Sequence, residues 1–372
     1  MPGIYIHIPF CKKICYYCDF FKSRDLDRKE SFLKALQKEL TERAGEGSDE
    51  TFQTVYFGGG TPSVLSPGEV EELLEAVYKN YRISEEAEIT FEANPEDVEV
   101  QYARELLKAG INRISIGCQS FLERDLQLMN RRHNAEGSLQ AVLTAAEAGF
   151  RNISIDLIYG LPQLTQEEWE NELERALALP VQHLSAYLLT FEKGTVFGKW
   201  LEKGKIHIPP EESIVEQYNA LIRMTKGKGF VHYEISNFGK EGFFSRHNML
   251  YWSREKYLGF GPSAHSYDLR ERKWNVSDLK KYVRQKEWVA GREKLSDNDH
   301  FNDYLLTSLR TIRGADRQYM EKTFGPEMTG SFLRSVAGWI ATGHITEDNG
   351  KYRLTDKGIL VSDTIISDCM IT

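Results

Sequence analysis

Short apolar segments alternate along the chain with longer segments in which apolar residues recur every three or four positions. The first pattern is typical of strands and the second of amphipathic helices. Because most of the short segments are largely apolar, we expect strands that are buried on both faces. The strands predicted in this way are 3–10, 54–59, 88–93, 113–119, 152–160 and 183–190, and the helices between them are 28–44, 66–81, 96–110, 136–149 and 165–179.

This alternation predicts six β/α units in series, which indicates a parallel sheet with helical crossovers. Six units are fewer than the eight of a complete (β/α)₈ barrel. We therefore favour an open, partial (β/α)₆ barrel, and a doubly wound sheet is the second choice.

The pattern changes after about residue 200. One further helix is predicted over 209–230, and aromatic- and glycine-rich sequence follows to about 290. Two more helices then lead to "HITEDNGKYRL", in which Asp-Asn-Gly indicates a hairpin turn, and a final helix follows. We expect a small α+β, winged-helix-like domain with a capping role. The predicted domains are 1–200, 201–295 and 296–372.

Composition limits the possible functions. The 372 residues carry a net charge of −8, which argues against a dedicated nucleic-acid binder. The sequence has no apolar segment of membrane-spanning length, and "MPGIYIHIPF" lacks the basic start of a signal peptide. We therefore expect a cytoplasmic protein, in which clustered cysteines bind metal or act in catalysis more often than they form disulfides.

Three of the five cysteines lie in "CKKICYYC", as Cys11, Cys15 and Cys18. They are too close together for simple packing to explain them. A zinc site would need a fourth ligand, and His7 is the only nearby candidate. A [4Fe–4S] cluster held by three thiolates keeps one iron open for a substrate or cofactor, and this is the interpretation we favour.

Further candidate residues follow the other predicted strands. The turn "GGGTPS" comes after the second strand, and its glycines allow a ligand to approach the backbone, although a tight βα turn explains them equally well. Ligands of parallel α/β folds bind at the carboxyl ends of strands. Polar residues in or after the later strands are Glu92, Gln119, Arg131 and Asp156.

The CxxxCxxC motif after the first strand resembles the signature of the radical S-adenosylmethionine (SAM) enzymes. In that family the amino and carboxylate groups of SAM chelate the open iron, and a GGGTP-like turn holds the amino group. The resemblance implies a SAM pocket formed by Tyr5, Tyr17, Gly59, Gly60, Thr61, Glu92, Gln119, Arg131 and Asp156.

Within this superfamily, the motifs resemble the branch that contains oxygen-independent coproporphyrinogen III dehydrogenase and a group of heme chaperones. The dehydrogenase carries a fourth cysteine where this chain has Phe20, and a longer segment before its first strand. The resemblance therefore favours a heme chaperone with a [4Fe–4S] cluster, SAM and heme. The alternative is decarboxylation of coproporphyrinogen III through a 5′-deoxyadenosyl radical, and whether the protein is an enzyme stays open.

The segment "RHNMLYW" matches the HNxxYW motif of the chaperone group. A lone His-Asn pair is more often a capped turn, but here two aromatic residues follow at the fixed spacing. The resemblance implies a heme site apart from the cluster loop, with His265 as a second candidate ligand. The implied partners are heme, heme-acceptor proteins such as membrane respiratory proteins, an electron donor for the cluster, and a second copy in a homodimer. The implied heme residues are His247, Asn248, Tyr251 and Trp252.

Overall fold

Six parallel strands, side by side in sequence order, form the centre of the fold. The computed structural model describes residues 2–284 and 287–371. A doubly wound sheet would reverse its strand order near the middle, and this sheet does not, so the predicted partial barrel is confirmed. The strands are β1 (Gly3–Ile8), β2 (Phe52–Gly59), β3 (Ile83–Ala93), β4 (Arg113–Gln119), β5 (Ile153–Tyr159) and β6 (His183–Leu188).

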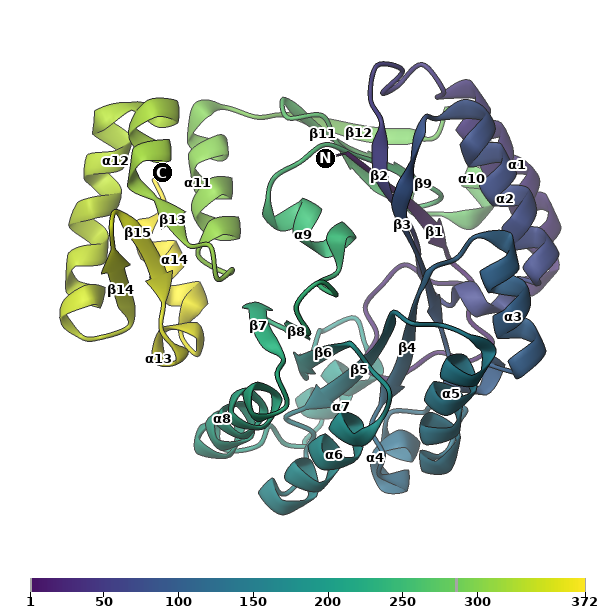
Figure 1. Cartoon of the computed structure of the whole chain (residues 1–372), viewed down its shortest axis with the longest axis horizontal. Helices are drawn as coiled ribbons and strands as arrows, with labels where there is room; N and C mark the ends of the chain where they lie inside the picture. Colours follow the sequence, from purple (N-terminus) through teal and green to yellow (C-terminus); the bar gives the residue numbers. More distant parts are fainter. Residues whose placement is uncertain (1, 285–286, 372) are drawn as a thin grey trace.

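Helices cover the convex side of this curved sheet (Figure 1). Two of them begin with the reciprocal capping box that Ser66 and Thr165 form with the glutamate three residues later. The short helix α4 was not predicted from the sequence. The helices of this layer are α1 (Lys29–Glu42), α2 (Pro67–Asn80), α3 (Val100–Ala109), α4 (Glu123–Leu128), α5 (Ala135–Ala148), α6 (Gln166–Ala178), α7 (Val196–Glu202) and α8 (Glu211–Gly227).

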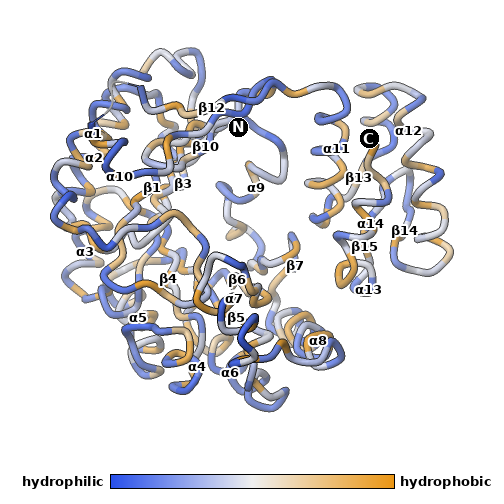
Figure 2. The backbone as a smooth tube through the Cα atoms, turned by 180° about the vertical axis from the view of Figure 1, so that it is seen from behind, coloured by the Kyte–Doolittle hydropathy of each residue, from blue (hydrophilic) through white to orange (hydrophobic). Residues whose placement is uncertain are grey.

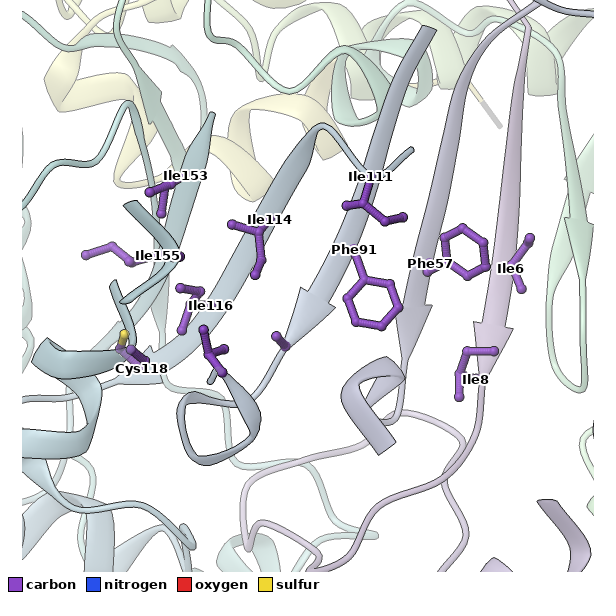
Figure 3. Close-up of a cluster of buried hydrophobic side chains, with 14 of the residues drawn as sticks. Ile6, Ile8, Phe57, Phe91, Ile111, Ile114, Ile116, Cys118, Ile153 and Ile155 are labelled. Carbon is purple, nitrogen blue, oxygen red and sulfur yellow. The ribbon is translucent and has the colours of Figure 1, made fainter. Parts of the chain in front are cut away.

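The two faces of the sheet differ in polarity. The convex face packs under the helices through apolar side chains, including Ile6, Phe57, Phe91, Ile116 and Ile155 (Figure 3). The intervening residues point to the concave face, and most of them are polar. Most of these inward residues are buried, as expected for strands covered on both faces, but the inner face is largely polar because the strands alternate with a period of two. Inward residues include Tyr5, His7, Thr54, Tyr56, Thr90, Glu92, Arg113, Ser115, Ser154, Asp156, His183 and Ser185.

The sheet continues beyond the six strands at both ends. Next to β1 lies β9, which runs parallel to it, and antiparallel β10 to β12 follow. Next to β6 lie β8 and β7. The edge strand β12 is largely hydrophilic (Figure 2), which opposes pairing with other chains. These elements are β7 (Val231–Glu234), β8 (Asn237–Gly239), α9 (Arg246–Trp252), β9 (Tyr257–Phe260), β10 (His265–Tyr267), β11 (Glu271–Asn275), α10 (Leu279–Arg284) and β12 (Val289–Lys294).

The C-terminal segment has its own apolar core and a three-stranded sheet. The predicted hairpin is confirmed, and its turn residues Asn349 and Gly350 have φ angles of 52° and 78°. Helix α12 is kinked at Gly325, directly before Pro326. The elements are α11 (Asp297–Ser308), β13 (Ala315–Asp316), α12 (Arg317–Ala341), β14 (Ile345–Asp348), β15 (Lys351–Leu354), α13 (Asp356–Ile359) and α14 (Ser362–Cys369).

This C-terminal segment contacts both ends of the large sheet (Figure 1). The backbone of Ile235, directly after β7, donates to the Arg310 carbonyl at 3.0 Å. At the other end, Arg272 on β11 pairs with Asp303 on α11. The segment therefore spans the open side of the partial barrel. In the part of the chain that the structure describes, no helix is long and apolar enough to cross a bilayer.

A buried carboxylate joins α1 to the added strands. Glu39 is fully buried, and its oxygens accept from Arg43 at 2.6 Å, the Asn275 amide at 2.7 Å, and the Gly261 backbone at 3.0 Å. The Tyr282 hydroxyl also donates to it. A buried charge with this many partners is stable only while all of them are present.

We predict that Glu39→Ala lowers the free energy of unfolding by about 3–5 kcal/mol, because it removes one of the two carboxylates that pair with buried Arg43, and with it the acceptor of the buried Tyr282 hydroxyl. Chemical denaturation followed by circular dichroism measures this change. On the same helix, Glu30→Ala removes only an exposed ion pair with Lys34, and its midpoint should match that of the wild type. Equal midpoints for both variants would contradict the prediction.

Candidate functional site: a cysteine loop at the strand ends

The cysteine loop begins where β1 ends, and backbone hydrogen bonds hold its course. The Cys11 amide donates to the Ser23 carbonyl at 2.9 Å, so the loop returns to its starting point. The Tyr16 amide donates to the Met129 carbonyl at 3.1 Å, and the Asn130 side chain donates to the Ile14 carbonyl at 2.8 Å. These contacts fix the path of the loop.

Two of the three cysteines lie next to side chains from the segments that follow β2 and β4. The Thr61 hydroxyl donates to Cys11 Sγ at 3.4 Å, and Arg131 Nη1 donates to Cys15 Sγ at 3.3 Å. Burial raises the pKa of Cys11 to about 11, and it also raises the pKa of Cys18. The thiols of Cys11 and Cys18 therefore keep their protons at neutral pH and would release them on binding iron.

This arrangement fits an iron–sulfur cluster better than zinc. Among the described residues, no three His, Cys, Asp or Glu side chains converge to hold a single ion. His7, the fourth candidate for zinc, uses Nε2 on the Phe21 carbonyl and Nδ1 on the Tyr5 hydroxyl. In a cubane cluster each thiolate binds a different iron, so the sulfurs need not converge. Arg131 Nε is buried without a hydrogen-bond partner, which leaves a cationic donor beside Cys15 for an anionic ligand.

The glycine turn after β2 lies close against the cysteine loop. Gly59 has a φ of +111°, and a Cβ there would lie 2.5 Å from the His7 ring. A Cβ on Gly60 would lie 2.8 Å from the Pro9 backbone. The Gly60 amide donates to the Ile8 carbonyl at 2.8 Å. Glycine is needed here because the ends of β1 and β2 approach too closely for a side chain.

Polar residues from the next strands face the same region. Glu92 accepts from the Tyr56 hydroxyl at 2.7 Å and from the Gly59 amide at 3.3 Å, and burial raises its pKa to about 7. Asp156 accepts from Ser115 at 3.3 Å, and burial raises its pKa too.

The remaining predicted SAM residues complete this rim. Gln119 ends β4 with a φ of +68°, which is strained for a residue other than glycine. Arg131 Nη2 donates to the Gly117 carbonyl at 2.7 Å, next to that strand end. Tyr17 is half-buried next to Cys15, and burial raises its pKa. Tyr5 stacks on Tyr56 on the inner face.

The HNxxYW segment forms α9, which lies on the concave side of the sheet and not apart from it (Figure 1). His247 is only 1% exposed. Its Nδ1 bonds with the Thr54 hydroxyl at 2.7 Å, and its Nε2 with the Tyr251 hydroxyl at 2.8 Å. Asn248 and Trp252 are half-buried. Helix α9 contacts Gly3 and Thr54 near the amino ends of β1 and β2, whereas the cysteine loop follows the carboxyl end of β1. A heme site apart from the cluster loop therefore stays a prediction.

Several inward residues were missed in the sequence. Tyr56 contacts Glu92, and His183 hydrogen-bonds with Ser154 at 2.7 Å and with Tyr233 at 2.7 Å. Arg113 is 2% exposed, and its Nε lacks a hydrogen-bond partner. The sequence feature that could have revealed Arg113 is the alternation along β4, where Arg113 and Ser115 stand two residues apart and so point to the same face of the sheet.

Comparison with known proteins agrees with this fold and motif. A family model described as the Radical SAM superfamily matches residues 5–176. The chain is 33% identical to the protein named heme chaperone HemW of Bacillus subtilis, over 98% of each chain. It is 36% identical to the mitochondrial radical S-adenosyl methionine domain-containing protein 1 of Danio rerio, over 99% of this chain and 87% of that one.

A solved structure supports the fold. Coproporphyrinogen III oxidase (HemN) from Escherichia coli superposes with a TM-score of 0.86, at 24% identity, over 99% of this chain and 90% of that one. The chain therefore belongs to the radical SAM superfamily and, within it, to the HemW family. Membership of the superfamily implies a [4Fe–4S] cluster and SAM, and the cysteine loop is suited to hold the former.

We predict that replacing Cys11, Cys15 or Cys18 with serine removes most of the iron and the broad visible absorption of the anaerobically reconstituted protein. Serine is a poor substitute for the thiolates that such clusters require. Iron analysis and absorption spectra measure the loss. Cys118 points to the convex face, towards the Ser138 carbonyl, so Cys118→Ser should retain its iron. Loss of iron from that control would contradict a cluster held by these three cysteines alone.

Proposed function

We propose that this protein is a heme chaperone that carries a [4Fe–4S] cluster on Cys11, Cys15 and Cys18, binds SAM beside it, and delivers heme to acceptor proteins. The observation that carries the proposal is full-length similarity to proteins named heme chaperone HemW. The HNxxYW segment on α9 adds support. We further propose the cytoplasm as its location, and a redox protein as electron donor for the cluster.

The proposed SAM pocket uses the strand ends around the cluster. Glu92 and the turn formed by Gly59, Gly60 and Thr61 would hold the amino group, and the unpaired Arg131 Nε would meet the carboxylate. When bound, SAM would supply radical chemistry to the site. The residues of the chain bind and orient it and exclude water. Asp156, Gln119, Tyr5 and Tyr17 would complete the pocket.

For heme, we propose that α9 contributes the contacts. Asn248 and Trp252 lie on its half-buried side, and the indole ring offers flat apolar surface to a macrocycle. Imidazole is a common axial ligand of heme iron. For His247 to serve in this role, one of its ring nitrogens must leave its hydrogen bond to Thr54 or Tyr251.

The dehydrogenase alternative is less well supported. Phe20 occupies the position of the fourth cysteine, and its side chain is 70% exposed beside the cluster loop. A phenylalanine offers no donor atom to a metal or a substrate. Similarity to the Escherichia coli oxidase at 24% identity supports the fold only.

We predict that SAM binds more tightly as the pH rises from 6 to 8. Burial holds the pKa of Glu92 near 7, so the fraction of its carboxylate form, which accepts hydrogen bonds from the SAM amino group, grows about tenfold over this range. Tyr56, Asp156 and Arg113 face Glu92. The negative charge of Asp156 favours the protonated form of Glu92 and so raises its pKa. Calorimetry under anaerobic conditions measures the affinity at each pH. Glu92→Gln should bind weakly with no such pH step, and a flat wild-type profile would contradict this role.

We predict that hemin titrated into the protein gives a shifted Soret band, and that Trp252→Ala weakens binding because it removes apolar surface from α9. His247→Ala should move the band position, as loss of an axial ligand does. Absorption titration measures both changes, and transfer of heme to an apo acceptor tests the delivery step.

The control for this titration is His265→Ala. His265 is exposed on β10 beside Trp274, and it should leave the spectrum unchanged. A wild-type protein that binds no heme would contradict the chaperone function. A spectrum altered by His265→Ala but not by His247→Ala would reassign the ligand.

A further inference from the structure

His247 is held in one orientation inside the barrel. Thr54 on β2 fixes Nδ1, and Tyr251, one turn later on α9, fixes Nε2. Burial lowers the pKa of His247 to about 3, so the ring is neutral. A neutral imidazole has one donor and one acceptor, and both nitrogens are used here.

The helix that carries His247 is itself tightly fixed. The two oxygens of Glu88 accept from the backbone amides of Arg246 and His247, both at 3.1 Å. Gly3 on β1 lies directly beneath the helix, where a Cβ would lie 2.6 Å from Leu250. The close approach of β1 and the buried carboxylate leave α9 no freedom to shift along the sheet.

The His247 ring also contacts the strand residue that leads to the proposed SAM pocket. Its centroid lies 4.9 Å from that of Tyr56, and the rings are inclined by 27°. The Tyr56 hydroxyl donates to Glu92 at 2.7 Å, and Glu92 accepts from the Gly59 amide at 3.3 Å. Three successive contacts therefore join α9 to the glycine turn.

We propose that His247 is a positioning residue of the SAM pocket, which acts by holding the Tyr56 ring so that its hydroxyl orients the Glu92 carboxylate. This inference rests on the proposed function, in which Glu92 binds the SAM amino group. The neutral, fully bonded imidazole is suited to this role because it packs against Tyr56 without adding charge. It gives the HNxxYW segment a function that does not require contact with heme.

A double-mutant cycle tests the inference. The SAM affinity of the anaerobically reconstituted protein is measured by calorimetry for Tyr56→Phe, His247→Ala and the double variant. Each single substitution should weaken binding by about tenfold, since each disturbs one hydrogen bond to a carboxylate. Because both act through the Tyr56 hydroxyl, the double variant should bind as weakly as Tyr56→Phe alone.

A merely structural role for His247 predicts a different result. In that case His247→Ala would lower the melting temperature and leave SAM affinity unchanged, or the losses of SAM affinity in the two single variants would multiply in the double variant. Either result would overturn the inference. If His247→Ala fails to fold, Thr54→Val releases Nδ1 with little change in shape, and it should weaken SAM binding by about threefold.

The matched control is Tyr81→Phe, which removes a buried tyrosine hydroxyl that donates to the Leu40 carbonyl at 2.9 Å, away from the pocket. It should keep wild-type SAM affinity. A wild-type protein that binds no SAM contradicts the proposed function itself. Wild-type binding with undiminished affinity in Tyr56→Phe and His247→Ala contradicts the inference alone.

Discussion

The alternation of apolar and polar side chains along six parallel strands is the constraint on which the rest of this structure depends. One set of alternate residues packs under the helices and holds the sheet together, as Ile6, Phe57 and Phe91 do. The other set faces the concave side, where most of its polar side chains are buried and cannot hydrogen-bond with bulk water. Most of these inward polar groups hydrogen-bond with a neighbouring side chain, although Thr90 Oγ1 and Arg113 Nε have no partner. Tyr56 with Glu92, and His183 with Tyr233, are such pairs, and they hold the interior side chains in fixed orientations.

The same constraint explains which parts of the molecule could be predicted from sequence. The six β/α units follow from local periodicity, and so does the Asn349-Gly350 turn, because each pattern lies within a few residues. The cysteine loop is also local. The position of α9 is not, since it depends on Gly3, Thr54 and Glu88, which lie far from it in the chain. The inward role of Arg113 was hidden because an arginine at the start of a strand is usually solvated.

If His247 both positions Tyr56 and ligates heme iron, the two roles compete for one ring. Ligation would take one ring nitrogen from its bond to Thr54 or Tyr251 and shift the ring from its stack on Tyr56. Binding of SAM and binding of heme would then be linked, and each would change the affinity of the other by the same factor. A chaperone could use such a linkage to release its cargo when the neighbouring cofactor site fills.

The place of β1 in the sheet has a consequence for synthesis of the chain. This strand emerges long before β9, which begins at Tyr257, yet it pairs with β9 on one side. About 250 residues separate the two, which at ribosomal rates corresponds to about 10–50 s. During that interval the edge of β1 next to the cysteine loop lacks its strand partner, and an open edge invites pairing with other chains. During synthesis, the segment that carries Cys11, Cys15 and Cys18 therefore lies beside an unpaired strand edge, which folding helpers or transient structure of the nascent chain would cover.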